Sequence, residues 1–158
     1  MNRQMAEVFF YHLTTSPLEQ ALPDLLEKVR GNAWRALIRG TDQNRLSRLD
    51  EHLWQYRDDG FLAHGLAGGE HDADQPILLT TGTDNTNNAE ILLLAHGAKT
   101  DAAEAGTFTR VCLMFDGNNP DELTAARADW KALTDAGIAA QYWAQENGRW
   151  TKKAEKSA

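Results

Sequence analysis

Three short apolar segments in the middle of the chain constrain its fold more than any other feature: Ile77–Thr80, Ile91–Ala95 and Val111–Phe115. None of them carries a charged residue. Strands that are buried on both faces are typical of the centre of a parallel sheet, because helices cover both sides of such a sheet. The three segments therefore predict an α/β protein with a mainly parallel central sheet.

Strand-like and helix-like segments alternate along the first third of the chain: strands over Glu7–Leu13 and Trp34–Arg39, helices over Leu18–Val29 and Gln43–Tyr56. Pro23 falls inside the first helix, where a kink or a late helix start is expected. Thr41 or Asp42 can cap the second helix. The alternation predicts parallel pairing through right-handed crossovers.

The last third of the chain reads as one helix followed by a hairpin. The helix begins at Asn119-Pro120 and stops at Gly137, a residue that suits a helix C-terminus. Ile138–Gln145 predicts a strand, and Asn147-Gly148 is a strong hairpin-turn signal that lets Trp150 pair back. We expect one α/β domain over residues 1–150 and a flexible basic tail over residues 151–158.

Composition excludes several classes of protein. The 158 residues carry 16 basic and 23 acidic side chains, a net charge of -7, which argues against a chain that mainly grips nucleic acid. The single Cys112 excludes an internal disulfide and a Cys-rich zinc module. No membrane-length apolar stretch and no signal peptide are recognised, so the sequence predicts a cytoplasmic protein.

The usual motifs of a nucleotide-binding enzyme are missing. The chain contains neither GxGxxG nor GxxxxGK[ST]. The turn Leu13–Pro17 could present backbone N–H groups to an anion, although an ordinary capped turn is the favoured interpretation.

Other catalytic or metal-binding patterns are weak. Cys112 lies in an apolar segment, where a thiol is usually inert, and the adjacent Asp50 and Glu51 point to different faces of a helix. Four side chains within one polar stretch could bind a cation or simply be solvated: His64, His71, Asp72 and Asp74. The sequence therefore predicts no catalytic or metal-binding residue.

Aromatic side chains beside charged ones are the remaining candidates for a binding site. Trp54 ends the second helix and Phe61 follows it, while Trp130 lies between Arg127 and Lys131 on the last helix. Large aromatic residues next to arginine suit protein recognition. The alternative is that these aromatic residues belong to the core.

Several of these segments also resemble a known family, the chi subunit of bacterial DNA polymerase III. The similarity is most specific in Arg48–Trp54 followed by Phe61–Gly68, and it continues in Ala126–Leu133. It extends from about residue 7 to residue 150. The resemblance implies a three-layer α/β/α fold, similar to the Rossmann fold but without a nucleotide-binding motif.

The resemblance also implies a function. Chi is an accessory subunit of the polymerase holoenzyme that links the clamp loader, through a psi-like subunit, to the acidic, Phe-ended tail of single-stranded-DNA-binding protein. It implies no catalysis by this chain, no cofactor and no metal, although the assembly itself is a nucleotidyltransferase. Contact with DNA would be indirect, the chain would have no membrane contact, and some members bind a helicase instead of psi.

The family's binding residues transfer to two places in this chain. The tail site corresponds to Arg127, Trp130 and Lys131, and the psi or helicase site to Trp54, Phe61 and His64. Two positions depart from the family, because some members have a lysine where this chain has Leu123 and many have one near Thr134. We therefore expect a less basic tail site, to which Arg110 or the pair Lys152 and Lys153 could add charge. No role is assigned to Gly82–Thr107.

Two other functions stay open at this point. One is a nucleotide- or small-molecule-binding enzyme with a Rossmann-like fold, against which the missing phosphate motifs count. The other is a direct single-strand binder that uses its tryptophans as stacking platforms, against which the net charge of -7 counts.

Overall fold

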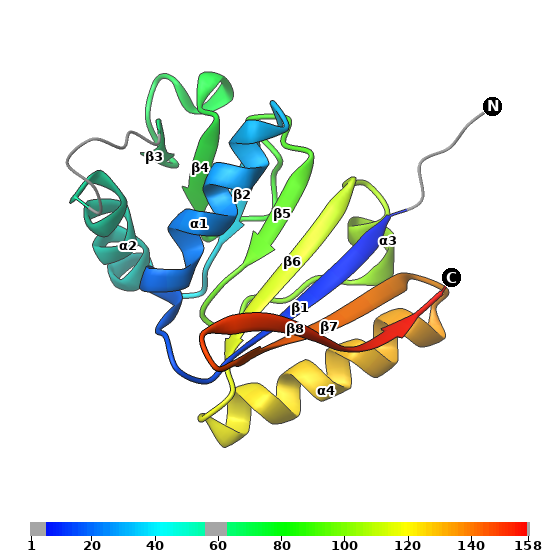
Figure 1. The fold of residues 1–158 in the computed structure, drawn as a ribbon. Helices are drawn as coiled ribbons and strands as arrows, with labels where there is room; N and C mark the ends of the chain where they lie inside the picture. Colours follow the sequence, from blue (N-terminus) through cyan, green and yellow to red (C-terminus); the bar gives the residue numbers. More distant parts are fainter. Residues whose placement is uncertain (1–5, 56–62, 158) are drawn as a thin grey trace.

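An eight-stranded sheet forms the centre of the computed structural model, which describes residues 6–55 and 63–157 (Figure 1). The strands are β1 (Glu7–Leu13), β2 (Ala36–Arg39), β3 (Gly65–Leu66), β4 (Ile77–Thr80), β5 (Ile91–Leu94), β6 (Arg110–Asp116), β7 (Ala139–Glu146) and β8 (Arg149–Lys156). The helices are α1 (Leu18–Gly31), α2 (Gln43–Gln55), α3 (Ala102–Ala105) and α4 (Pro120–Asp135), with a 3-10 turn at Asp72–Asp74.

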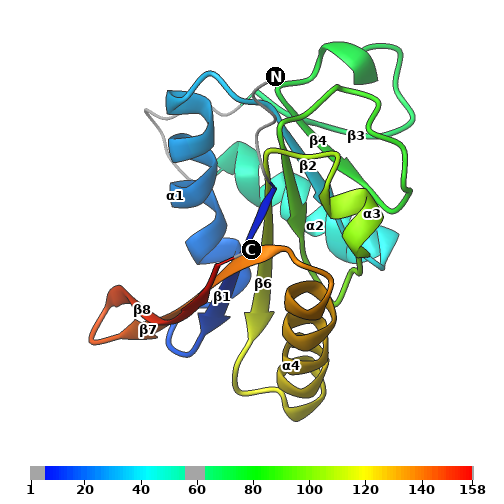
Figure 2. The same ribbon diagram turned by 90° about the vertical axis from the view of Figure 1, so that its right-hand side faces the viewer.

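The sheet is parallel except at one edge. Its strand order is β3-β4-β2-β5-β6-β1-β7-β8, and only β7 and β8 pair antiparallel. The helices α1 and α2 lie on one face and α3 and α4 on the other (Figure 2). The prediction of a three-layer α/β/α fold with a mainly parallel sheet is confirmed.

Alternating side chains of the strands supply two separate apolar layers. In β1, Val8 and Phe10 point toward α4, whereas Phe9 and Tyr11 lie on the α1 side. The three apolar segments of the sequence form β4, β5 and β6, and Leu92 and Leu93 of β5 are fully buried in opposite layers. Burial on both faces explains why these strands contain no polar alternation.

The helix ends follow from local sequence. Asp42 caps α2, since its Oδ1 accepts hydrogen bonds from the N–H groups of Asn44 and Arg45 at 2.8 and 3.3 Å. Asn119 caps α4 in the same way. The helix α1 begins at Leu18 and continues through Pro23, so a late start is not observed. Among the described residues, no helix has the length and apolar content to cross a membrane.

The prediction of a frayed tail is wrong for residues 151–156, which form most of β8. The turn before this strand has Asn147 and Gly148 at φ 52° and 75°, the left-handed geometry that favours a tight hairpin. Trp150 anchors the strand, because its ring packs edge-on against Tyr11 with centroids 5.2 Å apart. The basic composition of these residues indicated a solvated tail. Backbone pairing with β7 and the contact of Trp150 hold them in a strand instead.

Candidate protein-binding surfaces

The first candidate surface lies where α4 crosses β1 and β7, over an aromatic cluster. The Trp130 ring meets Phe10 at 5.4 Å and Tyr142 at 6.0 Å between centroids, in both cases edge-on. Phe10 and Tyr142 are themselves stacked, 6.3 Å apart. Phe10 is fully buried, whereas Trp130 and Tyr142 are half-buried. Trp130 is therefore at the edge of the core, with part of its ring in contact with solvent.

Arg127 lies three residues before Trp130 on α4, about one helical turn, and is exposed. It acts electrostatically on a hydrogen-bonded pair at the edge of the cluster, His12 Nδ1 and the Tyr142 hydroxyl, 2.8 Å apart. Burial lowers the pKa of His12, and the Arg127 charge lowers it further. Burial raises the pKa of Tyr142, and Arg127 partly opposes this rise. The charge of Arg127 thus acts on two groups at the edge of the aromatic cluster.

Lys131 is less available than Arg127. Its Nζ lies 2.8 Å from Asp135 Oδ2 in an exposed pair one helical turn long. The hydrogen bond to Asp135 raises the pKa of Lys131 and, conversely, lowers that of Asp135. Within the part of the chain that the structure describes, no carboxylate pairs with Arg127. The structure thus brings Arg127, Trp130 and Lys131 onto one helix, with Arg127 as the available cation.

The two positions that depart from the family are occupied by structural contacts. Leu123 packs, half-buried, against the apolar layer under α4. The Thr134 hydroxyl donates to the carbonyl of Trp130 at 2.7 Å, and Thr134 is buried. Neither position contributes charge, as predicted from the sequence.

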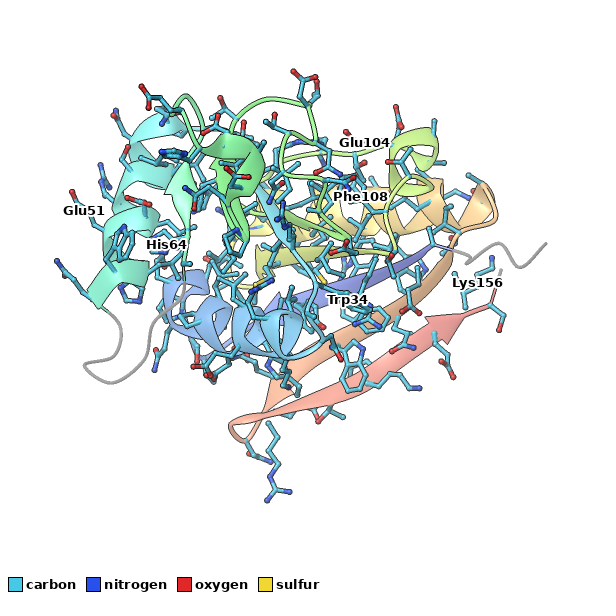
Figure 3. The ribbon with its side chains drawn as sticks, turned by 90° about the horizontal axis from the view of Figure 1, so that it is seen from above. Trp34, Glu51, His64, Glu104, Phe108 and Lys156 are labelled. Atoms are coloured by element: carbon cyan, nitrogen blue, oxygen red, sulfur yellow. The ribbon has the colours of Figure 1, made fainter. Side chains whose placement is uncertain are left out.

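The second candidate surface lies at the end of α2. Trp54 is 50% exposed and is the large apolar side chain that residues 6–55 and 63–157 leave most open to solvent. Its ring lies 4.3 Å from that of His64, which is buried beside α2 (Figure 3). His64 Nε2 lies 3.1 Å from the carbonyl oxygen and 3.2 Å from Oδ1 of Asp50. His64 therefore supports Trp54 from beneath, and Phe61 lies outside the described residues.

The backbone N–H groups of the turn after β1, which could have bound an anion, donate to a side chain of the protein itself. The N–H groups of Thr14, Thr15 and Ser16 all donate to Oε1 of Gln145, at 2.9, 3.1 and 3.2 Å. Converging N–H groups before a helix are the arrangement that binds anions. Here a carboxamide oxygen from β7 accepts these hydrogen bonds, so the turn needs no anion to satisfy its N–H groups.

A groove of about 890 Å³ lies between α1 and the β7–β8 hairpin, and its lining includes Trp34, Trp143 and Trp150. The Arg110 guanidinium lies over the Phe9 ring at 4.2 Å. That charge is already paired, since Nη2 of Arg110 lies 2.7 Å from Oε1 of Glu7. A nucleic-acid phosphate would have to compete with Glu7, so the groove gives little support to direct binding of a single strand.

The polar stretch with metal-ligating residue types does not assemble a metal site. Asp72 instead accepts hydrogen bonds from the N–H groups of Gly68 and Gly69, at 2.8 and 3.0 Å. No group of three or more possible metal ligands comes together in the described ranges. Cys112 is fully enclosed in the sheet, where burial raises the pKa of its thiol to about 12.

Sequence reasoning missed an ion pair that organises Gly82–Thr107. Arg39 at the end of β2 is buried and pairs with Glu104 of α3 through two bonds of 2.6 and 2.8 Å. Buried Asn87 adds two bonds, donating to the carbonyls of Ala36 and Gln75. A charged residue directly after the apolar run of β2 was the available signal.

These features define a Rossmann-like α/β protein. Its own Gln145 accepts the hydrogen bonds of the turn after β1, and its helices present aromatic and basic side chains. Residues 5–141 match the sequence profile of the family described as DNA polymerase III chi subunit, HolC, and the chain belongs to this family. The family membership predicted from the sequence is confirmed by this match.

Two curated relatives agree with the family match. A probable DNA polymerase III subunit chi of Rickettsia prowazekii is 30% identical over 90 residues, which are 57% of this chain and 54% of the relative. A DNA polymerase III subunit chi of Pseudomonas aeruginosa is 30% identical over 92 residues, 56% of this chain and 63% of the relative. The matched region therefore covers less than two thirds of either relative.

Proposed function

We propose that this protein is a cytoplasmic, non-catalytic adaptor that links the clamp loader to the acidic tail of single-stranded-DNA-binding protein. The observation that carries the proposal is the exposed Arg127 on α4, three residues before the half-buried Trp130, whose ring meets that of Tyr142. Among the described residues, no carboxylate pairs with Arg127. A tail that ends in Phe offers a terminal carboxylate and an aromatic ring. These two groups need a cation and an apolar surface within one residue's reach.

Each group of the tail has a matching group at this surface. The terminal carboxylate pairs with the guanidinium of Arg127, which can donate two parallel hydrogen bonds. The Phe ring packs against Trp130 and Tyr142, whose own edge-on geometry favours further aromatic contact. Lys131 adds long-range attraction for acidic residues, reduced by its pair with Asp135.

The second face of the adaptor is the surface of Trp54, which we assign to a psi-like subunit or a helicase. A half-exposed tryptophan held on a buried histidine is pre-oriented, so little side-chain entropy is lost when a partner covers it. Trp54 and Trp130 lie on opposite faces of the sheet, since α2 and α4 do. One partner on each face leaves room for both at once.

Fluorescence anisotropy of a labelled acidic peptide ending in Asp-Phe tests the tail site. We expect binding that is lost when the final Phe is removed. Arg127→Ala should weaken binding by about 1–3 kcal/mol, because the carboxylate loses a charged hydrogen-bond donor. Arg48→Ala, which removes an exposed arginine from α2 on the other face, is the matched control.

The outcomes separate the parts of the proposal. Unchanged affinity in a folded Arg127→Ala variant would show that the site is wrongly assigned. Equal weakening by Arg127→Ala and Arg48→Ala would mean that net charge alone attracts the peptide. Binding that survives loss of the final Phe would remove Trp130 and Tyr142 from the site.

A further inference from the structure

The edge strand β8 adds positive charge to the molecule outside the region that matches the family. Residues 5–141 match the family profile, whereas β8 spans Arg149–Lys156. Four basic side chains and one acidic side chain lie on this strand: Arg149, Lys152, Lys153, Lys156 and Glu155. Lysines on an edge strand often do no more than prevent two sheet edges from associating. Their positions relative to α4 indicate a more specific use.

The strand register decides which of these lysines faces α4. Ala154 pairs with Tyr142, and Lys156 pairs with Ala140. Directly paired residues of neighbouring strands project to the same side of a sheet. Tyr142 contacts Trp130 of α4, so Lys156 lies on the α4 side as well. Lys152 pairs with Trp143, whose side chain lines the groove on the α1 side, and therefore projects to the opposite face.

Lys156 also lies near the C-terminal end of α4, so it continues the row of positive charges that Arg127 and Lys131 begin. Figure 1 shows the end of β8 beside the C-terminal end of α4, and Figure 3, which labels Lys156, agrees. The charge of Lys156 contributes to the lowered pKa of Asp135, the last residue of that helix, after the larger effects of Lys131. Asp135 is already paired with Lys131. Among the described residues, two cations, Lys131 and Lys156, thus act on one carboxylate, Asp135, at this end of α4, while Asp121 and Glu122 make the other end acidic.

The spacing of these charges matches an extended peptide. Arg127, Lys131 and Asp135 stand on successive turns of α4, about 6 Å apart along the axis. An extended peptide advances about 3.3 Å per residue, so about two peptide residues span each interval. A chain whose terminal carboxylate is at Arg127 passes Lys131 about two residues earlier and reaches Lys156 about four residues earlier. The acidic N-terminal end of α4 disfavours the opposite direction.

We propose that Lys156 of β8 is a specificity-determining residue of the tail site. Lys156 binds an acidic side chain of the tail about four residues before the terminal Phe. This inference rests on the proposed tail-binding function and deepens it. The site then recognises the terminal Phe at α4 and the acidic character of the preceding residues at β8. Ionic contact with an exposed lysine adds modest affinity but favours acidic tails over other Phe-ended peptides.

Anisotropy titrations of the full chain at low salt test the inference with two variants and two peptides. The variants are Lys156→Gln and Lys152→Gln, which remove the same charge from opposite faces of one strand. The peptides end in the same Asp-Phe and differ only in Asp or Asn four residues before the Phe. Lys156→Gln should weaken the Asp peptide about twofold to fivefold, as expected for an exposed ion pair. It should leave the Asn peptide unchanged, and Lys152→Gln should leave both unchanged.

The results separate this inference from the function on which it rests. Wild-type protein that binds neither Phe-ended peptide would overturn the tail site and Lys156 with it. Tight binding that Lys156→Gln does not weaken would overturn the role of Lys156 and leave the adaptor function standing. Equal weakening by both variants, or of both peptides, would likewise refute a specific contact, since only general attraction would remain. Both lysines are exposed, so the variants should fold, which circular dichroism checks.

Discussion

The ion pair between Arg39 and Glu104 gives the sharpest test of how this fold is held together. Arg39 is 5% exposed, and besides two bonds to Glu104 it donates to the carbonyls of Gly82, Lys99 and Thr83. One side chain at the end of β2 therefore orients α3 and two loops. Glu104→Ala removes the only anion in this set and leaves a buried guanidinium with neutral acceptors.

The cost follows from this geometry. Removing one partner of a buried pair destabilises a protein by about 3–5 kcal/mol, because the remaining charge stays desolvated. The Glu104 side chain is 24% exposed, so water can partly replace it and the lower end, about 3 kcal/mol, applies. For a chain of this size, about 3 kcal/mol corresponds to a fall of roughly 6–12 °C in Tm. Alanine suits α3, so helix propensity adds no further loss.

Urea unfolding followed by tryptophan fluorescence measures the change, with Glu51→Ala on the exposed side of α2 as the control. Hydrogen bonds from Arg39 lower the pKa of Glu104 below its ordinary 4.5. Its contribution is therefore complete above pH 4.5 and is lost as pH falls through the lower folded-state value. The difference in the free energy of unfolding between wild type and Glu104→Ala should therefore become smaller as pH falls below 4.5. A loss below about 1 kcal/mol at pH 7 would refute the reasoning and show that the pair is effectively solvated.

Two further predictions concern the second surface and the response to acid. Trp54→Ala should abolish association with a psi-like partner in a pull-down, leave the affinity for the tail peptide unchanged and cost about 1 kcal/mol of stability, because half of the ring is already exposed; loss of both activities would identify Trp54 as a core residue. Burial and the nearby Arg45 lower the pKa of His96 from 6.5, against the opposing charges of Glu19 and Asp42. Stability should therefore fall as pH decreases below about 6.5, since the unfolded state binds the proton more readily. His96→Asn keeps a residue that tolerates φ 56° and should flatten part of that decline in unfolding curves; an unchanged pH profile would rule His96 out as its source.

The central strands could be predicted from the sequence because their physics is local. Burial on both faces requires continuous apolar residues, and this pattern locates β4, β5 and β6 within a residue or two. Edge strands lack that requirement. The two-residue β3 has no pattern of its own, and the lysines of β8 resemble those of a solvated tail. Their pairing depends on strands distant in sequence or on a single anchor such as Trp150.

The candidate surfaces divide along the same line. Arg127, Trp130 and Lys131 share a helix, so their spacing alone places them together. The partners of Trp130 come from β1 and β7, and those of Arg39 lie more than 40 residues away in the chain. Such contacts depend on the sheet order, which spacing does not contain. The role of Lys156 likewise requires the register of β7 with β8.

Gln145 links the fold to the proposed function. In an open α/β sheet, ligands bind beyond the carboxyl ends of the strands, where adjacent strands lead to helices on opposite faces. Here β1 and β6 meet that condition, because α1 and α4 lie on opposite sides. The N–H groups at that point all donate to Gln145, so their hydrogen-bonding capacity is already satisfied. A phosphate would have to displace an intramolecular acceptor, which disfavours nucleotide binding there and makes the outer faces of the helices the better candidates for recognition.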